Sequence, residues 1–322
     1  MARCIARRTC RRQRGAVPHR AVAVILAALQ SGQVGYPGAA VVLRAAYYVG
    51  SLGGAGLAFF ALLLGSRQEA TDAERLRRWA LGAAVLGLLA GIGALAAQVG
   101  VLTDGEALTD PEVWNVVLAS RAGSSYGLGG AGLLLVALLA VGSRWTIPAA
   151  LGGVLVCASY ALLGHTTMLT PRPVLAGLLL VHLLVAAFWI GSLLPLAWSA
   201  RREGPAAAHL VEAWARVAMI AVPVLAVAGL LLAWWILGGV QQLFASWYGW
   251  ALLAKLALVS VLLGFAAWHH RRLTPALAAN IPGAGRRLAR SIAMEALVAM
   301  LVLYAAAEMV STSPDTLVHA MN

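Results

Sequence analysis

Several ionisable side chains of this sequence lie inside long apolar runs, where such groups are rarely found. They are Arg44, Arg121, His182, Lys255, Glu295 and Glu308, with His165 near the end of another run. A charge at the centre of a bilayer costs at least about 2.5–3.5 kcal/mol, so these residues are functional candidates. The chemistry that would need them is ion binding or proton transfer. The two arginines lie near run ends, where they can equally serve as interfacial anchors.

A histidine and a tryptophan share one face of a predicted helix. His182 and Trp189 are seven residues apart, which is about two helical turns, and Gly191 follows them. Trp189 lies near mid-span and would shape the floor of an ion path through the membrane. Gly191 allows a neighbouring backbone to approach closely. For His182 two interpretations stay open, a hydrogen-bonded packing residue or a metal ligand.

His165 and Met168 precede this helix and add to the metal hypothesis. Imidazole and thioether are ligands that suit copper, and thioether favours Cu(I). His165 lies near its helix end, whereas His182 is about eight residues inside the next helix, an offset of roughly 9–12 Å. We therefore expect two successive sites, an outer one at His165 and Met168 and a deeper one at His182. Met309, at a similar outer depth, is a further candidate ligand.

The remaining ionisable groups would compensate charge or relay protons. Lys255 and Glu308 differ in predicted depth by only about 5 Å, so they could form a pair. Alternatively, Lys255 extends toward the interface or ties two helices together. Glu295 lies five residues after Arg290, and its alternative is a pairing with the basic loop. His269, which precedes Arg271 and Arg272 with His270 between, is expected to be solvated at the interface.

The amino-acid composition indicates the class of protein in which these residues lie. Of 322 residues, 61% are hydrophobic and 11% are charged, and the mean hydropathy is +0.83. Soluble domains are roughly 45–50% apolar and about 25% charged, so a soluble protein and a disordered chain are both excluded. The three cysteines form no zinc pattern and no disulfide framework. The chain is therefore predicted to be a polytopic membrane protein.

Eight segments are long and apolar enough to span a membrane. They lie at roughly 39–65, 79–99, 122–142, 147–167, 174–198, 217–238, 249–268 and 290–311. The predicted fold is all-α, one helical bundle of eight transmembrane helices over residues 38–315. It is preceded by a basic segment with a signal-like apolar run, residues 1–37, and followed by a short tail, residues 316–322.

The placement of arginine predicts the orientation, since Lys and Arg concentrate in cytoplasmic loops. Twenty of the 24 basic residues fall on one side, whereas the loops of the other side hold only Arg172 with several carboxylates. The C-terminus is then periplasmic and the first span begins outside. The run Ala21–Leu29 would have to cross before it, as a signal peptide or a short anchor. A wrongly assigned start codon is the alternative.

Several segments resemble the copper resistance protein D (CopD) family of bacterial inner-membrane proteins. They are the H-x6-W-x-G pattern from His182 to Gly191, the preceding Gly164-His165, the segment Ser246–Ala257, and the stretch from Arg290 to Pro314. The similarity is best over roughly 150–315 and looser over 40–145. The region around Arg121 matches the family weakly, and no fused CopC-like domain is present.

The resemblance implies eight membrane helices and a role in copper homeostasis or resistance. Members are thought to move copper across the inner membrane, often beside a periplasmic copper carrier called CopC. The expected function is therefore copper uptake from the periplasm, with Cu(I) or Cu(II) as the ion. The family also resembles di-haem cytochrome b membrane proteins, so a haem b-binding electron-transfer subunit is an alternative. A non-transporting membrane partner of a copper carrier is another.

No nucleophile motif, phosphate loop or hydrolytic motif occurs in the sequence, so we do not expect an enzyme or an ATP-driven step. The net charge of +12 is explained by the basic residues on the predicted cytoplasmic side, so no nucleic-acid partner is expected. The partners expected are a copper ion, the lipid bilayer and a CopC-like protein.

Overall fold

The computed structural model describes residues 38–103, 108–163, 169–237, 241–245 and 247–311, and these residues form helices and short connections without a strand. Eight long helices dominate. They are α2 (Gly38–Leu64), α3 (Ala70–Leu102), α5 (Arg121–Ala137), α6 (Thr146–Ser159), α7 (Arg172–Ala200), α8 (Gly204–Leu237), α10 (Trp247–Trp268) and α12 (Ala284–Ser311). With their short continuations, all eight are long and apolar enough to cross a membrane, which confirms the predicted fold class.

Three spans extend well beyond their predicted bounds, and all three do so at one end of the bundle. The second begins at Ala70, the sixth begins at Gly204, and the seventh continues to Ala278 through a π-helical turn, His269–Leu273, and α11 (Thr274–Ala278). The prediction followed the apolar runs. Helices continue past such runs because the backbone stays hydrogen-bonded while arginine side chains reach the interface.

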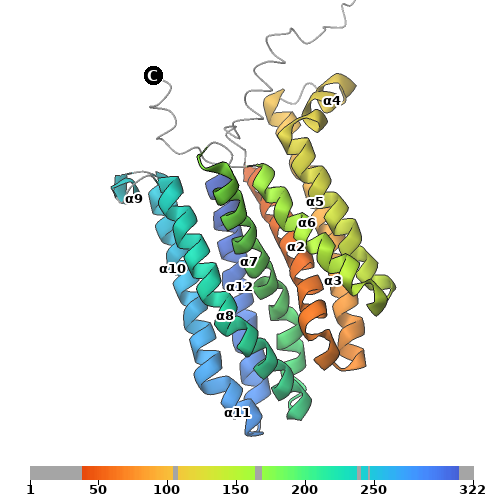
Figure 1. Ribbon diagram of the computed structural model, residues 1–322, viewed down its shortest axis with the longest axis vertical. Coiled ribbons are helices and arrows are strands. Elements are labelled where there is room, and N and C mark those ends of the chain that lie inside the picture. The colour runs from red at the N-terminus through yellow and green to blue at the C-terminus, as the bar shows by residue number, and fades with distance from the viewer. Residues whose placement is uncertain (1–37, 104–107, 164–168, 238–240, 246, 312–322) are drawn as a thin grey trace, which may run out of the picture.

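The helices form two groups of four that lie side by side (Figure 1). One group contains α2, α3, α5 and α6, and the other contains α7, α8, α10 and α12. They meet along α2 and α7, where Gly56 faces Gly191. A Cβ built on Gly191 would lie 2.3 Å from the carbonyl carbon of Gly56, so the prediction that a backbone approaches Gly191 closely is confirmed.

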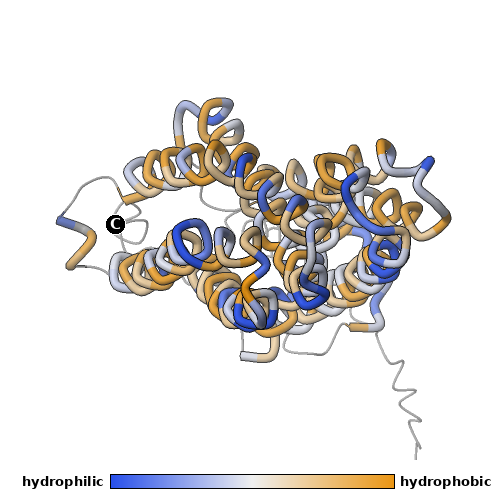
Figure 2. The backbone as a smooth tube through the Cα atoms, turned by 90° about the horizontal axis from the view of Figure 1, so that it is seen from below, coloured by the Kyte–Doolittle hydropathy of each residue, from blue (hydrophilic) through white to orange (hydrophobic). Residues whose placement is uncertain are grey.

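Apolar residues cover the sides of the bundle and hydrophilic ones gather at its ends and connections (Figure 2). Ile220 is 72% exposed and Leu89 is 65% exposed. Such exposure over so many large apolar side chains is compatible with lipid, not with water. The chain is therefore a multi-pass membrane protein.

We use the name basic end for the end of the bundle that carries Arg67, Arg75, Arg202, Arg271 and Arg286, drawn at the bottom of Figure 1. Here the first turn of α3 is held to the end of α7. Arg202 Nη2 lies 2.8 Å from Oδ1 of Asp72, which is almost completely buried, and Arg202 also pairs with Glu69. These ion pairs join the two groups of helices.

Two short helices outside the spans were not predicted, α9 (Gln242–Ala245) and a longer one between the second and third spans. The longer one is α4 (Pro111–Ala119), which starts with Asp110 accepting a hydrogen bond from the Glu112 backbone N–H, with proline in the first turn. Val113 and Val117 bury its apolar side against α3. The Asp-Pro-Glu signal for a helix start was present, but the helix is too short to span a membrane. The predicted signal-like segment and the C-terminal tail lie outside the described residues.

Candidate functional site

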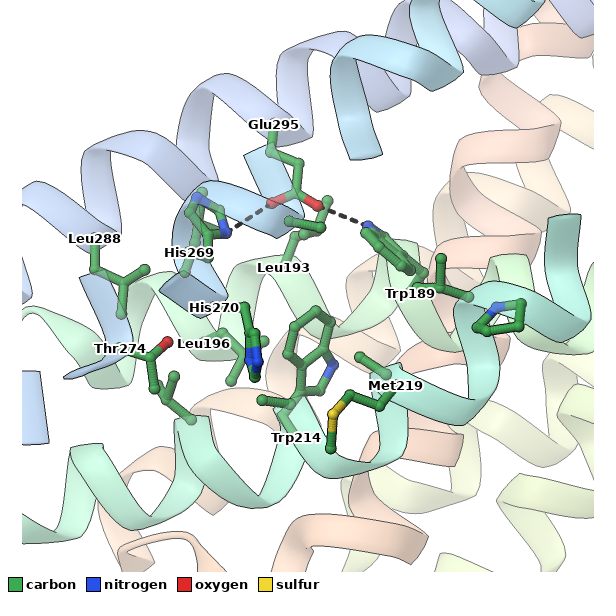
Figure 3. Close-up of a pocket in the computed structure, with 17 residues that line it drawn as sticks. Trp189, Leu193, Leu196, Trp214, Met219, His269, His270, Thr274, Leu288 and Glu295 are labelled. Atoms are coloured by element: carbon green, nitrogen blue, oxygen red, sulfur yellow. Dashed lines mark hydrogen bonds and ion pairs between the residues drawn. The ribbon is translucent and has the colours of Figure 1, made fainter. Parts of the chain in front are cut away.

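A cavity of about 290 Å³ lies between α7, α8 and α12 and the continuation of α10, in the half of the bundle nearer the basic end (Figure 3). α8 packs mainly on α7, and α10 packs mainly on α12, so the cavity is formed where these two pairs adjoin. Its wall is mostly aliphatic and aromatic. The polar side chains on it are those of Glu295, His269, His270 and Thr274, together with two indoles.

Glu295 of α12 is the central polar residue of this cavity. Its side chain is almost completely buried, with 1% of the residue exposed. The indole N–H of Trp189 donates a hydrogen bond of 2.7 Å to Oε1, and Nδ1 of His269 lies 3.3 Å from Oε2. The alternative prediction, that Glu295 pairs with the basic loop, holds only for His269. No arginine pairs with Glu295 among the described residues, and its other partner is Trp189 of α7.

His269 is the main site residue that the sequence analysis missed. It is buried, and its Nε2 lies 2.8 Å from Oγ of Ser291, so the expectation that it is solvated was wrong. The physical reason is that the helix does not end at residue 268. The π turn at His269–Leu273 keeps the chain against α12, where Ser291 and Glu295 lie one helical turn apart on the same face. That Ser-x-x-x-Glu spacing was the available signal.

Trp214 of α8 was also not singled out. Its ring packs edge-on against Trp189 with the centroids 5.7 Å apart. Its indole N–H is buried, lines the cavity, and has no hydrogen-bond partner within the described residues. Two tryptophans thus form one wall of the cavity, and the sequence analysis had singled out only Trp189.

His182 lies two turns before Trp189 on α7 and faces α8. A Cβ on Gly229 would lie 3.1 Å from Cε1 and 3.3 Å from Nδ1 of His182, so glycine there provides the space for the imidazole. Nδ1 is buried and makes no hydrogen bond of normal geometry in the described part of the chain. Lys255 of α10, the only lysine of the sequence, lies close enough to act on His182 electrostatically.

The other predicted site residues are not brought to the cavity. Met309 is buried near the end of α12, and Glu308 beside it is half-buried, thirteen residues or about 20 Å along the helix from Glu295. Gly191 packs on α2 and does not line the cavity. The ion pairs found among the described residues do not include Lys255, so the predicted pair with Glu308 is not seen.

The predicted outer copper ligands, His165 and Met168, lie outside the described residues. Within the described ranges, no three side chains from histidine, cysteine, aspartate and glutamate come together in a way that could hold a metal ion. His182 therefore stays a candidate ligand that would need partners of another type or from another segment.

An all-helical bundle with eight apolar spans and polar groups buried inside it defines a polytopic membrane protein with an intramembrane polar site. Comparison with known families is consistent with this and more specific. A family model described as "Copper resistance protein D-like, N-terminal domain" matches residues 33–172, and one described as "Copper resistance protein D" matches residues 208–309. The chain belongs to the copper resistance protein D family.

The two matches follow the two groups of helices. The first covers the group from α2 to α6, and the second covers most of α8, α10 and α12 with Lys255, His269 and Glu295. The H-x6-W-x-G pattern of α7 falls between the two matched ranges. No curated protein and no solved structure matched the chain.

Proposed function

We propose that this protein takes up copper from the periplasm and moves it across the bacterial inner membrane. Family membership supports a membrane protein of copper resistance. The placement of the arginines gives the orientation in the membrane. The basic end carries most of them and would face the cytoplasm, so the opposite end, where α12 ends, would face the periplasm.

The observation that carries the proposal is the buried Nδ1 atom of His182, whose side chain is half-buried. A buried nitrogen without a hydrogen bond costs free energy, roughly 1–3 kcal/mol, unless a ligand makes use of it. Nδ1 makes no hydrogen bond of normal geometry in the described part of the chain, the backbone of Leu225 lies near the ring, and Gly229 leaves room beside Nδ1. Copper is among the metal ions that an imidazole suits, and a thioether ligand would favour Cu(I).

The proposed path begins at His165 and Met168 near the periplasmic mouth and continues to His182. Met309, on the same side of the membrane, would add a thioether. Stepwise ligation by a few soft groups allows an ion to bind and to leave again, which transport requires. Trp189 forms the floor below His182, because its ring lies two turns farther along α7 and packs on Trp214.

The remaining ionisable groups would balance charge rather than ligate copper. Lys255 lies close enough to His182 to act on it electrostatically, and Glu295 accepts a hydrogen bond from Trp189. Glu308 would act near the mouth. A soluble CopC-like carrier would supply copper at the periplasmic face. In this proposal the protein moves the copper ion and catalyses no chemical reaction.

The experiment is copper uptake into cells and into liposomes that contain the purified full-length protein. His182→Ala should lower uptake by at least roughly tenfold, as loss of a metal-site group does. The matched control is His209→Ala, which removes an exposed histidine of α8 and should leave uptake unchanged. Unchanged uptake in His182→Ala would refute the proposed path.

Two further measurements separate the alternatives. Metal analysis of wild type, His165→Ala and His182→Ala should show loss of bound copper in the variants. A visible spectrum of the same samples tests the haem alternative, because a Soret band with reducible α and β bands would identify a haem protein. Copper binding without any flux would identify a non-transporting partner of a copper carrier.

A further inference from the structure

We propose that Glu295 is a proton-binding site that opens through its cavity toward the basic end, and that copper movement is coupled to the proton it carries. The inference rests on the proposed function for its coupling part, whereas the proton-binding part is independent of copper. The reaction is a proton transfer alone. An O–H bond forms on Oε2 while one breaks on a neighbouring water, and no electron is transferred.

Two polar atoms in the wall of the cavity have unused hydrogen-bonding capacity. Oε2 of Glu295 and the indole N–H of Trp214 are both buried, and neither has a hydrogen-bond partner in the described part of the chain. One is an acceptor and the other is a donor, on facing helices, α12 and α8. Buried polar groups are normally satisfied by protein or by water, so both point to a polar occupant of the cavity.

The cavity is large enough for that occupant to be several water molecules. Its volume is about 290 Å³, and a water molecule occupies about 30 Å³ of liquid volume. A buried water needs two to four polar partners, and the wall offers Glu295, Trp214, His269, His270 and Thr274. A purely apolar cavity would stay dry, but this one has polar groups along its length (Figure 3).

The polar groups form a route from Glu295 to the basic end. His269 contacts Oε2 directly, and His270 and Thr274 line the cavity on the continuation of α10, on either side of Arg271 and Arg272. His270 is exposed, whereas His269 and Glu295 are buried. Water bridging these side chains would let a proton move between the carboxylate and the solvent at the basic end.

The charged groups around Glu295 are few. His269 and His270 come from the continuation of α10, while α7 and α8 contribute the indoles of Trp189 and Trp214 to the wall. On α12 itself the nearest charged residue is Arg290, which is exposed. Among the described residues, no arginine or lysine pairs with Glu295. A carboxyl group without a fixed cationic partner is free to exchange a proton.

The competing explanation is that Glu295 only ties three helices together. The variant Glu295→Gln distinguishes the two, because the amide oxygen still accepts the hydrogen bond from Trp189 but the side chain no longer ionises. A structural tie would survive this change. Glu212→Gln is the matched control, since Glu212 is an exposed carboxylate of α8 near the same end of the bundle.

The first test is infrared difference spectroscopy on the full-length protein in liposomes during a pH titration. Wild type and Glu212→Gln should show the carbonyl stretch of a buried carboxylic acid that changes with pH, and Glu295→Gln should lack it. A band that persists unchanged in Glu295→Gln would overturn the proton site. If Glu295→Gln does not fold, His269→Gln should shift the pH at which the band changes, and an unshifted midpoint would count against the site.

The second test is copper flux into the same liposomes, with the membrane potential clamped. An imposed pH gradient should change the steady-state copper ratio of wild type by about tenfold per pH unit if one proton moves per copper. Glu295→Gln should retain flux down a copper gradient but lose this dependence. Wild-type copper flux that does not depend on the pH gradient would overturn the coupling and leave the proposed function intact. Absence of any wild-type flux would overturn the proposed function and with it the coupling, while the infrared result decides the proton site.

Discussion

Trp189 of α7 donates a 2.7 Å hydrogen bond to Glu295 of α12, and this contact fixes the orientation of the carboxylate inside the bundle. The second carboxylate oxygen is thereby directed toward His269 and the cavity. A charge-assisted hydrogen bond in a medium of low dielectric is stronger than one in water. The two residues, 106 apart in the sequence, therefore act as one unit.

Trp189→Phe tests this unit directly. The phenyl ring keeps most of the packing on Trp214 but donates no hydrogen bond to Glu295. We expect a loss of roughly 1.5–3 kcal/mol of stability, the range for a hydrogen bond to a charged group. The measurement is thermal unfolding of the detergent-solubilised protein. Adding Glu295→Gln to Trp189→Phe should cost less than the sum of the two single changes, and strict additivity would contradict the coupling.

The contact between Gly56 and Gly191 leads to a second prediction. A Cβ on Gly191 would lie 2.3 Å from the backbone of Gly56, and a Cβ on Gly56 would lie 1.8 Å from the carbonyl oxygen of Ala187. Because both neighbours are backbone, α2 and α7 must separate to accept any side chain. Gly191→Ala should lower stability by at least about 1–3 kcal/mol, as overpacking does.

The control for this prediction is Gly177→Ala, on the same helix. A Cβ at Gly177 meets nothing within 4 Å. This variant should match the wild type or exceed it slightly, because alanine favours the helix over glycine. Equal unfolding temperatures for Gly191→Ala and Gly177→Ala would show that the close approach of the two helices does not matter.

The sequence was sufficient for the fold and for part of the site. Apolar runs predict the spans well because lipid requires a continuous helix of about 20 apolar residues. Glu295 and Trp189 stood out because polar and indole groups at membrane depth need partners. Their mutual contact was not predictable, since no spacing rule relates residues on helices that are distant in the chain.

His269 shows why the remainder of the site was missed. Its neighbours Arg271 and Arg272 indicate an interface, and the apolar run does end at residue 268. Its burial depends on a π turn and on the position of α12, which are tertiary properties. Trp214 was similarly inconspicuous, because an aromatic residue near a helix end reads as an interfacial anchor until its packing on Trp189 is known.

A third prediction concerns the basic end, where Asp72 of α3 is buried against Ser199 of α7 and against Arg202 in the turn that follows α7. Asp72→Asn removes the charge that Arg202 faces and weakens the link between the two groups of helices. The loss should be below the roughly 3–5 kcal/mol of a fully buried pair, since Arg202 is partly exposed and keeps Glu69.

The matched control is Glu74→Gln, which breaks the ion pair of Glu74 with Arg78 on the same helix. Both partners of that pair are exposed, at 55% and 76%, so its loss should not be measurable. Thermal unfolding and limited proteolysis of the connection between α7 and α8 provide the measurements. If both variants unfold at the same temperature, the buried ion pair contributes nothing to the stability of the bundle.

The last prediction concerns Lys255, which lies close enough to His182 to act on it electrostatically. An ammonium group near the imidazole opposes the binding of a copper cation there, because like charges repel strongly away from water. Lys255→Met keeps the length and apolar character of the side chain and removes its charge. Affinity for Cu(I) should rise by roughly tenfold, equivalent to about 1.4 kcal/mol, while transport should slow because the ion leaves less readily. Competition with a chromophoric Cu(I) chelator measures the affinity, and Lys255→Arg, which keeps the charge, should resemble the wild type. An unchanged Cu(I) affinity in Lys255→Met would show that Lys255 does not influence copper binding.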